Sequence, residues 1–246
     1  MKDRLTIVGS GDAFGSGGRF NTCMFVELCG ERFFIDFGSS SLIALKRMGI
    51  AYGDVDKILI SHLHADHAGG LPSLLLEAMI VTRRKTPLTI AGPPGTCEWI
   101  KELQFRMYPG SERLVPRFDF CVIELTPGKN YQIGALCVTP HKMQHTPETN
   151  PSGLRIESAG RILSYTGDSE WTDEILVLAD GADILVSECY AHERKIPMHM
   201  CYGDIQANRH RLTVGKLVLT HAGPDMLNPP ADATEIWAED GLTVEF

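Results

Sequence analysis

The stretch Ser61-His62-Leu63-His64-Ala65-Asp66-His67-Ala68-Gly69-Gly70 decides how this chain of 246 residues is interpreted. Three imidazoles and one carboxylate fall within six residues, directly after the apolar run Ile58-Leu59-Ile60. Side chains alternate along an extended backbone, so the first two histidines point the same way. The turn that follows brings the Asp-His pair to a second point nearby. Imidazole and carboxylate groups are ligands that suit Zn, Fe, Mn or Co, and the stretch predicts a metal site.

One short stretch cannot fill two metal sites, so further ligands must come from elsewhere in the chain. His145, Asp168 and His221 each follow a segment expected to be a strand, where α/β proteins place their functional loops. Each signal is weak alone, because a single histidine after a strand is more often structural. Asp168 also has the alternative of capping a helix that begins after it. Together, and in this order after the histidine cluster, these three residues complete a candidate ligand set.

Short apolar runs alternate with helical patterns along the chain, which is typical of an α/β protein. Strands are expected at residues 5–8, 22–28, 32–36, 57–61, 88–91, 120–125, 131–139, 154–157, 161–165, 184–187, 216–220 and 242–246. Helices are expected at residues 40–48, 71–81, 96–107, 173–178 and 203–211. A glycine-rich loop at 9–18 lacks the Gly-Lys-Ser/Thr ending of a P-loop. This loop is expected either to border the cleft or to be a connector without ligand contacts.

Two pairs of segments look alike, which predicts an internal duplication. Lys57-Ile-Leu-Ile-Ser-His62 resembles Lys216-Leu-Val-Leu-Thr-His221, and the segment 32–38 resembles 161–167. Chance similarity between short strands is the alternative. If the duplication is real, each half contributes a β-sheet with helices outside, and the two sheets pack face to face. No linker divides the chain, so residues 1–246 are expected to form a single domain.

Composition limits the choice of partners and compartment. The formal net charge is −8, which is the wrong sign for a protein that depends on non-specific phosphate contacts. Small basic groups occur at 83–85, at Arg106, Arg113 and Arg117, and at Arg209 and Arg211, and solvated surface charge is the favoured interpretation of each. No long apolar run or signal peptide is found, so we expect a cytoplasmic protein without a membrane span.

The string HxHxDH at 62–67, followed by His145, Asp168 and His221, resembles the metallo-β-lactamase superfamily over nearly the whole chain. Further strings are similar to its tRNase Z-like branch: the opening strand with its glycine-rich loop and Asn-Thr step, the segment 61–71, the YTGDS string at 165–169 and the LTHxxP pattern at 219–224. The resemblance implies a four-layer αβ/βα sandwich with two mixed β-sheets packed face to face and helices outside.

The same resemblance implies a dinuclear site. One metal would be bound by His62, His64 and His145, and the second by Asp66, His67 and His221, with Asp168 bridging both. A water or hydroxide would lie between the metals, which typically sit about 3.5–4 Å apart. We expect Asp66 to be catalytic, orienting that water or taking its proton. Two divalent cations are expected, zinc first, with manganese or iron as alternatives.

Three features depart from the tRNase Z pattern. The long arm that grips tRNA lies in that branch between the positions matching His145 and Asp168, which are only 23 residues apart here. The His-Glu-Ala-Thr string, whose histidine assists the leaving group, is matched by Ser187-Glu188-Cys189-Tyr190. The negative net charge is the third departure. His192 or His199 is a candidate substitute proton donor, and a structural role is favoured for His199.

These observations predict a metal-dependent hydrolase, with a phosphodiesterase first. A nucleic acid, a cyclic nucleotide or a small phosphodiester is the expected substrate, with net charge disfavouring nucleic acid. One alternative is a hydrolase of a lactone, ester, thioester or sulfate on the same site. A second alternative is a metal-binding sensor with little turnover, and a site that uses only one metal is a third. A homodimer is a further expectation, with the apolar helix at 71–80 contributing to the contact.

Overall fold

Two seven-stranded sheets form the centre of the computed structural model, which describes residues 2–230 and 233–246. The first sheet has the order β14 (Thr243–Glu245), β1 (Arg4–Gly9), β2 (Cys23–Leu28), β3 (Glu31–Ile35), β4 (Lys57–Leu59), β5 (Leu88–Gly92) and β6 (Phe120–Glu124). The second has the order β13 (Ile236–Trp237), β12 (Lys216–Thr220), β11 (Ile184–Glu188), β10 (Arg161–Tyr165), β9 (Ser152–Ser158), β8 (Leu136–Lys142) and β7 (Tyr131–Ile133).

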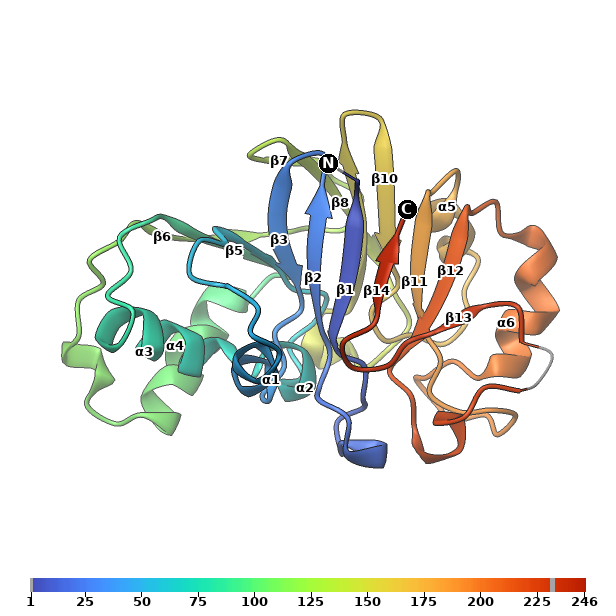
Figure 1. Cartoon of the computed structure of the whole chain (residues 1–246), viewed down its shortest axis with the longest axis horizontal. Helices are drawn as coiled ribbons and strands as arrows, with labels where there is room; N and C mark the ends of the chain where they lie inside the picture. The colour runs from blue at the N-terminus through green and yellow to red at the C-terminus, as the bar shows by residue number, and fades with distance from the viewer. Residues whose placement is uncertain (1, 231–232) are drawn as a thin grey trace.

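Helices cover the outer face of each sheet (Figure 1). The helices on the first sheet are α1 (Ser41–Met48), α2 (Ala65–Ala68), α3 (Leu71–Ile80) and α4 (Thr96–Met107). The second sheet carries α5 (Glu174–Ala179) and α6 (Tyr202–Asn208). The layers therefore run helix, sheet, sheet, helix, as the sequence predicted. Within the described ranges, no helix is long and apolar enough to cross a membrane.

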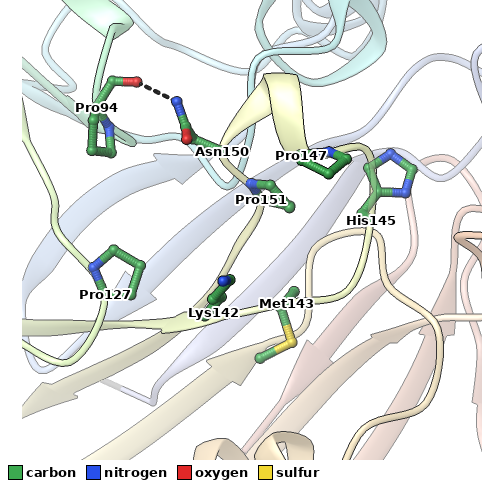
Figure 2. Close-up of a pocket in the computed structure, with 8 residues that line it drawn as sticks. All are labelled: Pro94, Pro127, Lys142, Met143, His145, Pro147, Asn150 and Pro151. Carbon is green, nitrogen blue, oxygen red and sulfur yellow. Dashed lines mark hydrogen bonds between the residues drawn. The ribbon is translucent and has the colours of Figure 1, made fainter.

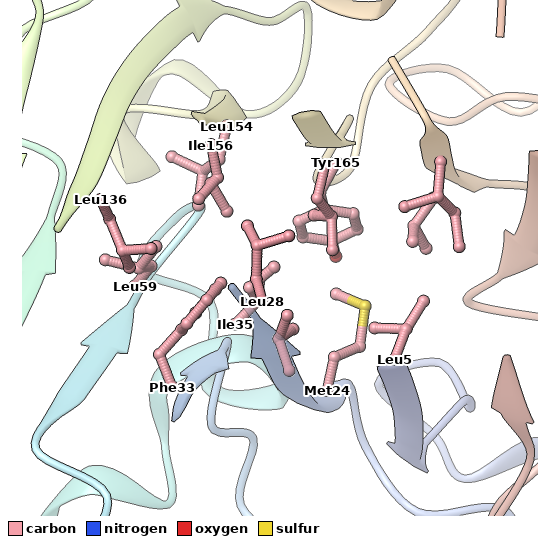
Figure 3. Packing of buried hydrophobic residues seen from close by; sticks show 14 of the residues in the cluster. Leu5, Met24, Leu28, Phe33, Ile35, Leu59, Leu136, Leu154, Ile156 and Tyr165 are labelled. Carbon is pink, nitrogen blue, oxygen red and sulfur yellow. The ribbon is translucent and has the colours of Figure 1, made fainter. Parts of the chain in front are cut away.

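The alternation of side chains along each strand builds the layers. Met24 and Val26 of β2 point into the cluster between the sheets, whereas Phe25 points out toward the helices. The same division places Phe33 and Tyr165 from opposite sheets in one buried cluster (Figure 3). Burial of these apolar faces fixes how the sheets meet, and so fixes which strand ends come together.

The two sheets repeat one pairing scheme. From β1 to β6 the successive pairs are antiparallel twice and then parallel three times, and the pairs from β8 to β13 follow the same order. In this scheme β3 is equivalent to β10, which agrees with the predicted similarity between the segments 32–38 and 161–167. The same scheme makes β4 equivalent to β11, so the predicted match between the strands at 57 and 216 was wrong. That second likeness reflects two buried strands that each deliver a histidine.

Three local predictions also need correction. The single strand expected at 131–139 is a hairpin, β7 and β8, which turns at Gly134 with a φ of +63°. The turn after the first two histidines contains one turn of helix, α2. The two-residue strand β13 was missed because so short a segment has no periodicity to detect.

Candidate metal centre

Seven side chains that the sequence singled out meet at the ends of strands from both sheets. His62, His64 and His145 offer three ring nitrogens within 4.8 Å of one another. Asp66, His67, Asp168 and His221 form a second such group. The chain thus brings together loops that follow β4, β8, β10 and β12. The structure brings all seven residues together, and it places Asp168 with the second group.

Asp168 lies between the two groups. Its Oδ2 atom is 3.9 Å from Nε2 of His62 and 3.9 Å from Nε2 of His145. Its Oδ1 atom is 3.2 Å from Nε2 of His67. One carboxylate therefore faces both groups, which is the position a bridging ligand needs. Gly167, with a φ of +60°, makes the turn that delivers it.

Several inward-facing atoms of this centre have no hydrogen-bond partner. Within the described residues, Nε2 of His67 and Oδ1 of Asp168 are buried and lie 3.2 Å apart, yet neither atom makes a hydrogen bond of good geometry. An unpaired buried polar atom costs about 1–3 kcal/mol, so native structures rarely keep one without a function. The donor set, imidazole nitrogens and carboxylate oxygens, is the one that divalent transition metals prefer. The residues present therefore fit divalent metal ions.

Outer hydrogen bonds hold two of the imidazoles, those of His67 and His62, with one nitrogen free to face inward. Nδ1 of His67 donates to Oδ2 of Asp36 over 2.7 Å. Nδ1 of His62 lies 3.1 Å from Oγ of Ser61, whose hydroxyl donates to the same Asp36. Each contact engages Nδ1 and leaves the Nε2 lone pair for a cation. The sequence analysis did not assign Asp36, although its position at the end of β3 was a signal.

Two buried residues of this centre have a left-handed backbone conformation. Asp36 has a φ of +55° and His221 a φ of +60°, and both residues are buried. Non-glycine residues in this region cost about 1–3 kcal/mol and cluster at functional sites. At Gly38 a Cβ atom would lie 2.1 Å from the main-chain oxygen of Asp66, so only glycine allows α2 to approach β3 so closely.

The two groups differ in their electrostatics. Burial holds the pKa of His62 and His145 below the usual value, which favours neutral rings with lone pairs available. Burial opposes the charge of His221, but Asp168 and Asp66 outweigh it and raise its pKa to about 9. Burial likewise opposes ionisation of Asp168, yet the charges of His221 and His67 hold its pKa well below the usual range. Without a cation, protonated histidines therefore balance the carboxylates of the second group.

A third group extends the centre. Asp168 and His221 also lie with Glu188 and His199, and Nδ1 of His199 contacts Oε1 of the fully buried Glu188. Ser187, at the position expected for a catalytic histidine, is buried and donates to the main-chain oxygen of Glu188. His192 packs against Tyr202 instead, with ring centroids 5.7 Å apart. The structure therefore places His199, rather than Ser187 or His192, beside the metal-ligand candidates.

The centre lines a cavity of about 440 Å³. Its walls include Asp66, Asp168, His199, His221 and, from the glycine-rich loop, Phe14. The glycine-rich loop at 9–18 therefore borders the cleft and is not a connector remote from it. A second cavity of about 340 Å³ adjoins His145 and is lined largely by prolines, with Lys142 at its edge (Figure 2).

Two hydroxyls that precede ligand candidates, those of Ser61 and Thr220, differ in their contacts. The Ser61 hydroxyl does support His62, but the Thr220 hydroxyl is buried without a partner among the described residues. Arg84 was expected to be solvated surface charge. It is buried, and its guanidinium donates to the main-chain oxygens of Gly53, Val55, Thr86 and Pro87.

Comparison with known proteins assigns the family. Residues 3–236 match the family model described as Anti-Pycsar protein Apyc1. The chain belongs to this family. As a member of it, the chain is also similar to the Ribonuclease Z of Mycobacterium bovis, with 27% identity over 89% of this chain and 86% of that protein. The Ribonuclease Z of Methanosarcina mazei is 26% identical over 89% of this chain and 87% of its own length.

Solved structures support the fold of this family member. The metallo-β-lactamase fold protein YhfI of Bacillus subtilis superposes with a TM-score of 0.79 at 21% identity, covering all of both chains. The short form of human tRNase Z superposes with a TM-score of 0.80 at 22% identity, covering 98% of each chain. The chain thus has the metallo-β-lactamase fold and resembles Ribonuclease Z in sequence, and its clusters of histidine and aspartate could hold metal ions.

Proposed function

We propose that this protein hydrolyses small phosphodiesters with two divalent cations. The observation that carries the proposal is the meeting of two ligand groups on Asp168, at the wall of a cavity of about 440 Å³. Relatives of the chain are named Ribonuclease Z, and similar structures include a diphosphatase of the PhnP family and yeast PDE1. Those names point to phosphate esters.

His62, His64 and His145 would hold one cation, and Asp66, His67 and His221 the other, with Asp168 shared. Zinc suits so histidine-rich a set best, and manganese or iron are alternatives. When bound, the cations supply positive charge to the phosphate oxygens and lower the pKa of water toward neutrality.

The chain's own residues supply the proton transfers. Asp66 lines the cavity with a carboxylate, and it orients the attacking water and accepts its proton. His199 lines the same cavity and donates a proton to the leaving oxygen. Glu188 fixes the orientation of His199 through its contact with Nδ1, which leaves Nε2 for the substrate side. His199 and Glu188 together take over the function of the leaving-group histidine, whose expected position is occupied here by Ser187.

A small substrate fits the structure better than tRNA does. The segment between His145 and Asp168 forms a short 3₁₀ turn, Pro147–Thr149, and the hairpin of β9 and β10, which leaves no room for a tRNA-gripping arm. The net charge of −8 disfavours a polyanion. The cavity volume lies within the range of about 300–1,000 Å³ that is usual for small-molecule sites.

A substrate panel tests the proposal. Zinc- and manganese-loaded protein is assayed with bis-p-nitrophenyl phosphate, cyclic nucleotides and short RNA, and with a lactone and a thioester in parallel. We expect turnover of the small phosphodiesters and its loss in His64→Ala. Cleavage of only the lactone or thioester would favour the other hydrolase class. Stoichiometric metal without turnover of any substrate would favour the sensor.

Three further properties belong to the proposal. We infer that the chain acts as one domain in the cytoplasm and forms a homodimer. The helix α3, expected to contribute to a dimer, buries most of its apolar residues within the chain, and only Ile80 and the following Val81 are prominently exposed. Light scattering tests the dimer, and a monomeric mass would remove it.

A further inference from the structure

The cavity of about 340 Å³ beside His145 has no part in the proposed function. It lies where loops from both sheets meet (Figure 2). Pro94 follows β5 and Pro127 follows β6, whereas Pro147 and Pro151 belong to the loop between β8 and β9. The volume falls within the range of about 300–1,000 Å³ that is usual for small-molecule sites. The cavity is therefore large enough to hold a ligand of its own.

The walls of this cavity are rigid. A proline ring fixes φ and carries no main-chain N–H group that would need a partner. Nδ2 of Asn150 donates a hydrogen bond to the main-chain oxygen of Pro94 over 2.9 Å (Figure 2). This bond joins the loop after β8 to the loop after β5, and both loops line the cavity. A site that is already formed loses little entropy of ordering when a ligand binds.

The polar groups of this cavity favour an anion. Among the described residues that line it, one is a lysine, Lys142, and none has a carboxylate. The ammonium of Lys142 makes no ion pair or hydrogen bond with the described part of the chain. Ser152 pairs with Lys142 across β8 and β9, so the two side chains lie on the same face of the sheet. Ser152 is only 3% exposed, and its hydroxyl has no hydrogen-bond partner among the described residues.

His145 borders the cavity without offering a nitrogen to it. Its Nδ1 atom donates to the main-chain oxygen of Met198 over 2.7 Å, and its Nε2 atom lies 3.1 Å from Nδ1 of His64. Both nitrogens are thus engaged on the side of the metal-ligand candidates. A molecule in the cavity would contact the carbon atoms of the ring and would leave the ligand set complete.

We propose that this cavity binds a small monocarboxylate with an apolar body. The carboxylate accepts hydrogen bonds from the Lys142 ammonium and the Ser152 hydroxyl, and the apolar body lies against the prolines and Met143. A phosphate monoester carries about two negative charges at neutral pH, so a single lysine would leave one of them unpaired. The site does not depend on the proposed function, because it uses neither the metal ions nor Asp66.

Two probes of the same size and shape test this inference. Calorimetry of the zinc-loaded protein is performed with 3-phenylpropionate and with its uncharged amide. We expect the acid to bind with a Kd of about 1 mM or lower. The amide should bind about 5- to 20-fold more weakly, because it lacks the charge that pairs with Lys142. Lys142→Gln should weaken the acid by the same factor and leave the amide unchanged.

Matched variants separate this cavity from other sites. Lys101→Gln removes an exposed lysine of α4, outside the cavity, and should leave the affinity for the acid as in wild type. Ser152→Ala should weaken the acid but not the amide. Binding of the acid that survives Lys142→Gln would place it elsewhere, for example on the metal ions, and would overturn the inference. Equal affinities for acid and amide, an equal loss in Lys101→Gln, or no binding up to about 10 mM would also overturn it.

Discussion

Nδ1 of His145 donates a hydrogen bond to the main-chain oxygen of Met198, and the two atoms lie 2.7 Å apart. The bond joins the loop after β8 to the loop that carries His199. Met198 has a φ of +69°, and its nitrogen donates to Oε1 of Glu170 over 2.6 Å. Glu170 thus holds a residue with a strained backbone, Met198, whose carbonyl oxygen orients a ligand candidate.

Replacement of Glu170 by alanine should weaken metal binding about 10- to 100-fold, because the Met198 oxygen loses its support and His145 loses its fixed orientation. Competition with a chromophoric chelator measures this affinity. Glu148→Ala removes an exposed carboxylate from the same region and should have no effect. An unchanged affinity in Glu170→Ala would show that the Met198 contact does not position His145.

Asp36 should contribute as much to metal affinity as a metal ligand does, although its hydrogen bonds lie on the outer side of the imidazoles. Its carboxylate accepts the Ser61 nitrogen, the Ser61 hydroxyl and Nδ1 of His67, over 2.7–2.8 Å. Asp36→Asn tolerates the left-handed backbone but removes the charge that accepts these bonds. We expect metal affinity to fall about 10- to 100-fold. Ser61→Ala deletes one of the three bonds and should cost less, and the reverse order would contradict this assignment.

The role of His199 can be tested through the leaving group. His199→Asn should reduce kcat about 10²- to 10⁴-fold for a dialkyl phosphodiester, whose leaving oxygen needs a proton. The loss should be much smaller for a p-nitrophenyl ester, which departs without one. Glu188→Gln should show the same dependence on the leaving group. A uniform loss on both substrates would point to a structural role for His199.

Arg84 tests the fold apart from the site. Its buried guanidinium donates to four main-chain oxygens near the start of the strands β4 and β5. Arg84→Met leaves these oxygens without their donor and should lower the free energy of unfolding by about 2–4 kcal/mol. Urea denaturation measures the change. Arg83→Ala, next to it and exposed, should change stability by less than about 0.5 kcal/mol.

The sequence predicted much of the fold because buried strands and ligand residues leave short, regular signals. The strand at 57–61 and its histidines were found from apolar residues followed by spaced imidazoles. Asp36 was missed because a single carboxylate after a strand has many explanations until His67 is seen beside it. The equivalence of β4 with β11 was also hidden, since strand order is set by long-range pairing that local patterns do not report.

The surroundings of His199 could not be predicted from the sequence for a similar reason. A histidine between two methionines looks like a packed side chain, and nothing local indicates a buried glutamate eleven residues earlier as its partner. Arg84 is the opposite case, because its basic run at 83–85 predicts a solvated side chain whereas Arg84 is buried. In both cases the partners are main-chain or side-chain atoms brought close only by folding.

The most direct test of the account is an anomalous-difference map from crystals of the zinc-loaded protein, collected on both sides of the zinc absorption edge. The account predicts two peaks, one among His62, His64 and His145 and one among Asp66, His67 and His221, with Asp168 between them. A cleft without a zinc peak, or zinc bound only elsewhere on the chain, would contradict it.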